Sequence, residues 1–288
     1  MASIENKIDF VMLFTVYGAN PNGDPLNENM PRTDYDGYGE VSDVCIKRKV
    51  RNRMQDMGYS IFVKSNDRID DDKYSLEERF CAEFESVKKF PDDVVYKASC
   101  EKWMDVRSFG QVITFQNRSI GIRGPVSISM AKSLSPVDVI SMQITRSTNG
   151  MKPKGDKARS ADTMGTKHYI EFGVYKVKGS INSYFADKTG FSAEDAEVIK
   201  ESLKTLFVND VSSARPEGSM EVKQLFWFTH PSKLGVASSA KIHDLIEINL
   251  KDDGIKPAKY QDYVIKLNEE KLSHLVEKGL RVEIIDGI

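Results

Sequence analysis

Residues 8–25 read IDFVMLFTVYGANPNGDP, and this stretch decides the expected fold. Residues 8–17 are almost continuously apolar and rich in β-formers, which is typical of a strand that is buried along most of its length. The run is too short to span a bilayer, so we interpret it as a strand and not as a signal sequence. The segment from Gly18 to Pro25 consists almost entirely of turn formers and predicts a polar loop that continues to about Glu40.

A helix is predicted after this loop, over residues 42–57. Ser42 or Asp43 can cap its first turn, and Gly58 can end its last turn. Its apolar side chains recur at helical spacing and form one stripe: Ile46, Val50, Met54 and Met57. A buried strand, a long loop and an amphipathic helix therefore form one unit.

The remaining pattern mixes helices and strands. Helices are expected at 75–89, before Asp105, at 192–207 and at 268–278, and strands at 111–115, 126–131, 139–145, 168–177, 222–228, 245–250, 263–267 and 281–285. Short connections between strands favour an α+β fold with helices on one face of an antiparallel sheet. The order of the main elements fits a β-α-β-β-α-β core, ferredoxin-like or RNA-recognition-motif-like. No linker divides residues 1–288, so a single elaborated domain is expected.

Composition excludes some classes of protein and leaves others open. The 288 residues include 41 Lys and Arg against 43 Asp and Glu, a formal net charge of −2, which does not exclude nucleic acid because binding depends on where the charges lie. Three scattered cysteines and four separated histidines offer no disulfide framework and no metal-ligand spacing, and they favour a cytoplasmic setting. Glycine motifs for nucleotide cofactors are absent, so neither a metal nor a cofactor is expected.

The helix over 42–57 carries a basic cluster that faces only Asp43 and Asp56 in its own sequence: Lys47, Arg48, Lys49, Arg51 and Arg53. Lys47 and Arg51 lie one turn apart beside the apolar stripe, an array that can engage successive phosphates of an RNA backbone. The capped N-terminus adds backbone amides. A solvated charged face is the alternative interpretation. The scarcity of acidic partners favours the phosphate site.

A second basic concentration lies in residues 146–167, where six Lys and Arg face two Asp. The segment is rich in Gly, Ser and Lys and predicts a protruding flexible loop or hairpin. Arg146 could contact nucleic acid there, and Met151 could wedge between bases. A mobile surface loop without a ligand fits equally well.

Arg107 and Arg123 each lie close to glycines, where backbone can approach a ligand. A structural ion pair between Asp105 and Arg107 is the alternative. The strand over 126–131 lacks the aromatic residues on which RNA-recognition motifs stack bases. RNA would therefore be held by its backbone, through loops and the first helix.

Three loop carboxylates, Asp24, Asp34 and Asp36, leave a metal-dependent nuclease open, although such residues more often shape turns. A third class of protein, a small-molecule enzyme on a ferredoxin-like core, requires a closed apolar pocket with convergent polar groups, for which the sequence offers no motif.

Seven segments, spread in order over most of the chain, carry a family resemblance: Asn20–Pro25, Pro31–Asp34, Ser42–Asn52, Asp105–Gly110, Gly121–Val126, Met164–Gly165 and Ala214–Gly218. They resemble the backbone subunit of type I CRISPR Cascade, the Cas7 family, and most closely its type I-C branch. The resemblance implies an RNA-recognition-motif-like palm, helical fingers at about 59–104 and a thumb loop at about 146–167. It also explains the missing aromatic platform, because guide bases must stay free to pair with a target.

The resemblance further implies a non-enzymatic subunit whose copies form a helical filament along one crRNA, with other Cascade subunits, and present the guide to invading DNA in antiviral defence. No membrane partner is implied. Related type III subunits cleave target RNA with a loop aspartate, so a metal-dependent ribonuclease using Asp24, Asp34 or Asp36 stays the alternative. Residue patterns and resemblance together give these candidate RNA-binding residues: Asn22, Arg32, Ser42, Lys47, Arg48, Arg51, Arg107, Arg123, Arg146 and Met151.

Overall fold

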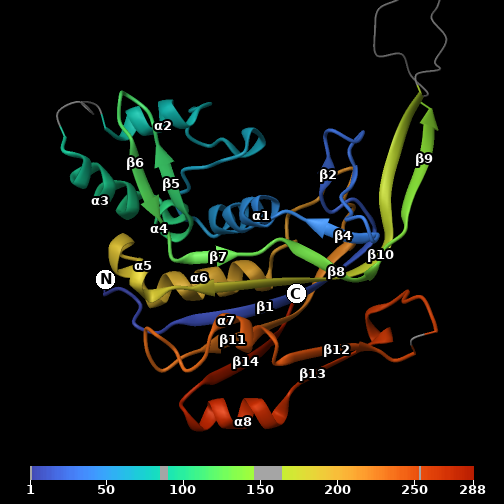
Figure 1. Ribbon diagram of the computed structural model, residues 1–288. Helices are drawn as coiled ribbons and strands as arrows, with labels where there is room; N and C mark the ends of the chain where they lie inside the picture. The colour runs from blue at the N-terminus through green and yellow to red at the C-terminus, as the bar shows by residue number, and fades with distance from the viewer. Residues whose placement is uncertain (1, 85–89, 146–163, 253) are drawn as a thin grey trace, which may run out of the picture.

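The computed structural model describes residues 2–84, 90–145, 164–252 and 254–288. Strand β1 (Ile8–Ala19) lies in the middle of its largest sheet, between β10 (Met164–Ile181) and β11 (Met220–Thr229), and pairs antiparallel with both. Hydrogen-bonded strands follow the order β14-β11-β1-β10-β8-β4, while β7 and β9 pair with other parts of β10 (Figure 1). The expected α+β class is confirmed.

The other strands are short: β2 (Gly23–Asp24), β3 (Met30–Pro31), β4 (Tyr38–Val41), β5 (Gly110–Ile113), β6 (Ile120–Arg123), β7 (Val126–Ile128), β8 (Ala131–Pro136), β9 (Val139–Thr145), β12 (Ile246–Leu250), β13 (Tyr263–Leu267) and β14 (Arg281–Asp286). The helices are α1 (Asp43–Asp56), α2 (Leu76–Glu83), α3 (Asp92–Lys102), α4 (Met104–Phe109), α5 (Ser183–Thr189), α6 (Ala193–Lys204), α7 (Ser239–His243) and α8 (Glu269–Glu277). None of the described helices is long and apolar enough to cross a membrane.

Strand β1 is apolar along most of its length because both of its faces are covered there. Phe10, Met12 and Phe14 belong to a core that includes residues of α1 and α6. The intervening Val11 and Leu13 belong to a second core, built with β11, α7 and β12 and flanked by residues of α8. The expectation of helices on one face only is therefore wrong. The C-terminal elements cover the opposite face, and Figure 1 shows the sheet between these two layers.

Residues 59–123, which we call the finger lobe, have a core of their own beside α1. Phe62, Phe80 and Trp103 are fully or almost fully buried there, together with residues of α3, α4, β5 and β6. Figure 1 shows α2, α3 and the β5–β6 hairpin grouped at one end of the molecule. The lobe's core continues past residue 104, through the β5–β6 hairpin.

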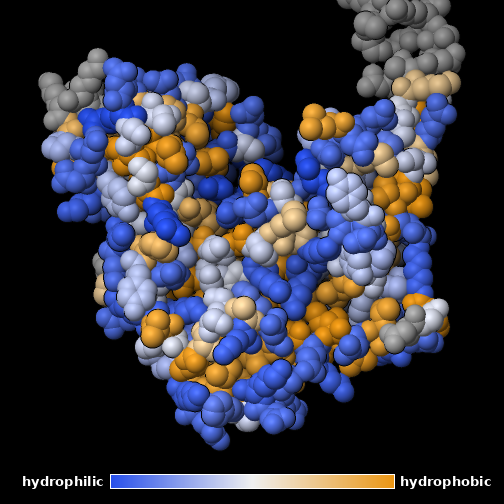
Figure 2. All heavy atoms as spheres, in the orientation of Figure 1, coloured by the Kyte–Doolittle hydropathy of each residue, from blue (hydrophilic) through white to orange (hydrophobic). Residues whose placement is uncertain are grey.

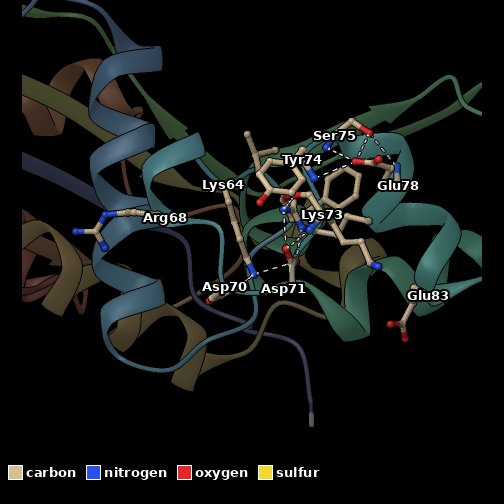
Figure 3. Close-up of polar contacts among 12 residues, drawn as sticks. Lys64, Arg68, Asp70, Asp71, Lys73, Tyr74, Ser75, Glu78 and Glu83 are labelled. Atoms are coloured by element: carbon tan, nitrogen blue, oxygen red, sulfur yellow. Dashed lines mark hydrogen bonds and ion pairs between the residues drawn. The ribbon is translucent and has the colours of Figure 1, made fainter.

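A network of charged groups holds the loop that leads into α2 (Figure 3). Arg79, which is only 6% exposed, donates from Nε and Nη2 to the carboxylate of Asp71, and from Nη1 to the carbonyl oxygen of Phe62 at 2.8 Å. Lys64 Nζ lies 3.1 Å from the same carboxylate. The hydrogen bond from Arg79 holds the pKa of Asp71 well below its usual range. Asp71 therefore stays ionised and fixes the start of α2.

The structure corrects several expected boundaries. Helix α2 ends at Glu83, short of residue 89, and residues 85–89 lie outside the described part. Residues 164–167 were expected in a loop but belong to β10, where Met164 pairs with Thr145 of β9. The alternation of apolar and polar residues is weak there, because both faces of this two-stranded ribbon are largely exposed. Strand β6 and helix α5 were not expected, and both are shorter than eight residues.

Replacing Asp71 by Asn is expected to destabilise the finger lobe by about 3 kcal/mol, because the buried Arg79 loses its counter-charge. Asp70→Asn is the matched control, since Asp70 is mostly exposed and expected to matter much less. The contribution of Asp71 is present above about pH 4 and is lost as the pH falls toward its lowered folded-state pKa. Hydrogen exchange of α2 amides measures the effect, and equal protection in the two variants contradicts it.

Candidate nucleic-acid interface

Figure 2 shows the molecule hollowed between the finger lobe and the lobe that carries β2–β4 and the β9–β10 hairpin. Helix α1 lies at the base of this hollow, which we call the α1 hollow, and the polar loop after β1 lies beside it (Figure 1). Chain segments that are far apart in sequence meet here. The hollow is therefore where most of the candidate residues have to be sought.

Asn22 and Ser42 are brought into direct contact. The backbone N–H and the hydroxyl of Ser42 both donate to Asn22 Oδ1, each at 2.9 Å. Ser42 Oγ also accepts from the N–H of Cys45 at 3.2 Å, as expected for the N-cap of α1. This chain of hydrogen bonds fastens the polar loop to the helix and fixes how the first turn of α1 is presented.

The expectation that the basic helix has few acidic partners besides Asp43 and Asp56 is wrong. Lys49 is buried and pairs with Asp210, which also lies 3.0 Å from Arg215. Arg53 pairs with Asp56 at 2.8 Å. Asp210 is remote in sequence, and only the fold brings it to α1. The local excess of basic residues is thus partly compensated by carboxylates that a reading of residues 42–57 cannot see.

Arg51 is a structural residue. Its side chain is 13% exposed, lies 2.9 Å from Asp105 and stacks over the ring of Phe109. Asp105 is fully buried and also accepts backbone N–H groups from Phe62 at 2.7 Å and Val63 at 3.0 Å. The pair therefore joins α1 to the finger lobe. Lys47 and Arg48 have the most exposed side chains among the cations of α1, with exposed fractions of 25% and 39%.

Lys47 and Arg48 have only weak internal partners. Lys47 Nζ lies 2.9 Å from Asp43, one turn earlier on the helix surface, and Arg48 is 3.9 Å from Asp210. Partly exposed pairs of this kind contribute about 0–1 kcal/mol, so an incoming phosphate can compete with them. The two residues are the part of the predicted basic array that remains free for a ligand.

Arg107 does not pair with Asp105. Its guanidinium forms two hydrogen bonds to Asp195, at 2.9 Å and 2.8 Å, and so joins α4 to the first turn of α6. Asp195 is also the acidic member of a capping box with Ser192. A mostly buried bidentate pair leaves Arg107 little capacity for RNA.

Arg123 is exposed and stacks over the ring of Phe185 in α5, with its guanidinium carbon 4.1 Å from the ring centroid. The neighbouring glycines have a purpose other than the expected approach to a ligand. A Cβ on Gly124 would lie 2.3 Å from the carbonyl oxygen of Ser108, and one on Gly110 would lie 2.3 Å from that of Ile122. The glycines let two backbone segments pack together.

Arg32 lies beside the polar loop, 3.2 Å from Asp24. Its Nε is buried and has no hydrogen-bond partner among the described residues. The backbone N–H of Arg32 donates to the carbonyl oxygen of Asn22, which links it to the Ser42 cap. Arg32 is therefore held in the loop through its backbone and through Asp24.

The loop carboxylates shape turns. Asp34 accepts the N–H groups of Asp36 and Tyr38 and pairs with Lys132, whose hydrogen bond lowers the pKa of Asp34. Asp24 accepts the N–H of Leu26 at 3.3 Å. Within the described ranges, no group of three or more His, Cys, Asp or Glu side chains is placed to hold a metal ion.

Sequence reasoning missed Lys132. Its side chain is exposed on β8, next to the edge strand β4, and lies over the ring of Tyr38, so it adds a cation beside the polar loop. No local pattern marks it, because β8 brings it there by pairing with β4. Arg146 and Met151 lie outside the described residues.

Comparison with known proteins gives the class first. A chain of a CRISPR RNA-guided surveillance complex superposes with a TM-score of 0.53 at 15% identity, covering 97% of this chain and 88% of that one. A chain of a second such complex, in a pre-nicking state, gives a TM-score of 0.49 at 16% identity over 77% and 78%. The first of these similarities shows that the fold is one found in a chain of such a complex.

The family follows from the sequence. The model of the family "CRISPR-associated protein Cas7" matches residues 6–268, and the chain belongs to this family. A CRISPR-associated protein Cas7 of Haloferax volcanii is 25% identical over 210 residues, which is 67% of this chain. The chain spans 61% of that relative's length.

Replacing Lys47 and Arg48 together by Ala is expected to weaken RNA binding and to reduce its salt slope by about one unit per lost phosphate contact. Stability should change by less than about 1 kcal/mol, because both pairs are partly exposed. Arg51→Ala should instead destabilise the chain by roughly 3 kcal/mol, because Asp105 is left buried without its cation. Filter binding at several salt concentrations and urea unfolding measure these effects, and unchanged RNA affinity in the double variant contradicts the assignment.

Proposed function

We propose that the chain is a guide-RNA-binding backbone subunit of a type I Cascade, of the I-C branch, and that its copies polymerise along one crRNA in an antiviral surveillance complex. The complex holds other Cascade subunits, works in the cytoplasm and presents the guide for pairing with invading DNA. The observation that carries the proposal is the Cas7 family match over residues 6–268. Helix α1, which lies at the base of the α1 hollow and carries the partly exposed Lys47 and Arg48, supports it.

In this proposal the chain forms a single elaborated domain, with the large sheet as palm, fingers starting near residue 59 and a thumb at about 146–167. Lys47, Arg48 and Arg32, whose side chains are partly exposed, contact guide phosphates. Arg123 offers an exposed cation that stacks on the ring of Phe185 in α5. Arg146 and Met151 act from the thumb.

In this proposal four of the candidates are positioning residues that hold helices in place: Asn22, Ser42, Arg51 and Arg107. Their polar groups are committed to one another, to Asp105 or to Asp195, and they set the orientation of α1 against the finger lobe and α6. The backbone of the guide is held in this way while its bases are left free. The cover on the sheet supports this division, because α7, β12–β13 and α8 occupy the face that an RNA-recognition motif uses for stacking bases.

The subunit is proposed to be non-catalytic. Two of the three loop carboxylates, Asp24 and Asp34, are occupied by neighbouring N–H groups and by Arg32 or Lys132. A metal-dependent ribonuclease would need at least one of them, or Asp36, free to bind a metal ion.

Purified chain mixed with guide RNA is expected to form assemblies whose mass rises with guide length, and to leave complementary RNA intact in Mg²⁺ or Mn²⁺. Size-exclusion chromatography with light scattering measures the first and gel electrophoresis the second. A chain that stays monomeric and binds no RNA contradicts the proposal. Cleavage that disappears in Asp34→Ala establishes the ribonuclease instead.

A further inference from the structure

The largest sheet has two edge strands, and their outer sides differ. Along the outer side of β4, the N–H of Glu40 donates to the carbonyl oxygen of Arg32 at 2.8 Å, and the N–H of Asp34 donates to that of Tyr38 at 2.9 Å. The polar loop therefore closes this edge. Strand β14, at the other end of the strand order (Figure 1), pairs with β11 alone among the described residues, and most of its residues are exposed. This second edge is open.

The register of the sheet fixes which residues of β14 face the open side. In an antiparallel pair, residues bond to the neighbouring strand at every second position and point away from it in between. His230 donates to the carbonyl oxygen of the opposite Lys7 at 2.9 Å, so even-numbered residues of β11 bond to β1 and odd-numbered ones bond to β14. Gly287 agrees, because its N–H donates to the carbonyl oxygen of Lys223 at 3.4 Å. Since the register joins even-numbered residues of β11 and β14, three residues direct their N–H and C=O groups away from β11 and bond to no other described residue: Val282, Ile284 and Asp286.

Hollows lie along both faces of β14. One, of about 730 Å³, lies between β14, α6 and α8, and Glu197, Val276 and Glu283 are among the residues that line it. The other, of about 670 Å³, lies between β14 and β13, and Ile265 and Ile284 help to line it. Val276 and Ile284 leave apolar surface exposed, at 49% and 54%. Strand addition requires this combination, in which an edge offers backbone hydrogen bonds and each face has room for alternate side chains.

The free backbone groups specify the kind of occupant. Donors and acceptors at every second residue match a chain that is itself extended, whereas a helix bonds its own backbone groups internally. Strand β14 of a second copy is a poor match. Every antiparallel register that joins two or more of the free residues places Glu283 opposite its own copy or Asp286 opposite an apolar side chain.

We propose that β14 binds an extended segment of another protein, which joins the sheet as an antiparallel strand. Every described pair in this sheet is antiparallel. The bound side chains opposite Val282 and Ile284 are apolar and lie toward β13 and α8. The side chain opposite Glu283, whose own side chain is 52% exposed, is Lys or Arg and lies toward α6. The site shares no residue with the α1 hollow, so it does not depend on the proposed function.

Peptides with matched backbone changes test strand addition. The probe is acetyl-Lys-Thr-Val-Lys-Val-Glu-amide, whose second Lys lies opposite Glu283 when its two Val lie opposite Ile284 and Val282. N-methylation of both Val removes the donors that face β14 and should weaken binding at least about tenfold. N-methylation of Thr and of the second Lys removes donors that face away, and this control should bind within about threefold of the unmodified peptide. NMR titration of the full chain measures the affinities.

The chain itself supplies two further measurements. Without peptide, the amides of Val282 and Ile284 should exchange with solvent at least about tenfold faster than those of Glu283 and Ile285, and bound peptide should slow them. Ile284→Lys should weaken peptide binding at least about tenfold, because it puts a charge where an apolar side chain of the peptide lies. Ile144→Lys, the same change at an exposed position of β9, is the control and should leave peptide binding unchanged.

Strand addition at β14 is excluded if the unmodified peptide does not bind, if the two methylated peptides bind equally, if Ile284→Lys binds normally, or if the amides of Val282 and Ile284 exchange slowly in the free chain. A dimer of the chain alone that Ile284→Lys dissociates, detected by light scattering, also overturns the proposal, because a second copy then occupies the edge. RNA is absent from all of these measurements, so their failure leaves the proposed function intact.

Discussion

The structure depends on one constraint, which is that β1 has to be covered on both faces. Its side chains alternate between two cores, and neither set tolerates water. Helices α1 and α6 cover one face, and the C-terminal elements cover the other. Because the second cover occupies the broad face of the sheet, a ligand can approach the sheet only from the side. Helix α1, packed on the first face and bordered by the finger lobe, is then the natural floor for a long polymer.

Carboxylates brought from elsewhere in the chain decide which basic residues are free. Asp105 and Asp195 hold Arg51 and Arg107, and Asp210 holds Lys49. These pairs fasten α1 and α4 to their neighbours, so charge that looks available in the sequence is used to orient helices. This division is compatible with a formal net charge close to zero. Many cations serve the fold, while others, such as Lys241, Lys271 and Lys278 between α7 and α8, have no salt bridge among the described residues.

The elements with strong local signals were predictable. The caps of α1, α2 and α6 are formed by Ser42, Ser75 and Ser192, and β9 has its expected bounds. The pairing of basic residues was not predictable, because Arg51 and Arg107 find partners 54 and 88 residues away. Nor was the second cover of the sheet, since the pattern of a strand shows that a face is buried and does not show what buries it. Asn22 was a candidate ligand contact, and its bond to Ser42 gives it a structural part.

Strand β10 runs without interruption for 18 residues, from the centre of the sheet into the β9–β10 hairpin. At roughly 3.3 Å per residue this is a continuous rod of about 60 Å. The hairpin is thus anchored in the core, and its outer described pair, Thr145 and Met164, is held at a distance fixed by strand length. Insertions or deletions in the β9–β10 hairpin of homologous chains should therefore come in pairs of residues. One added residue would exchange the two faces of the hairpin beyond it. The length of β10, counted from its pairing with β1 in the core, therefore sets how far the hairpin extends.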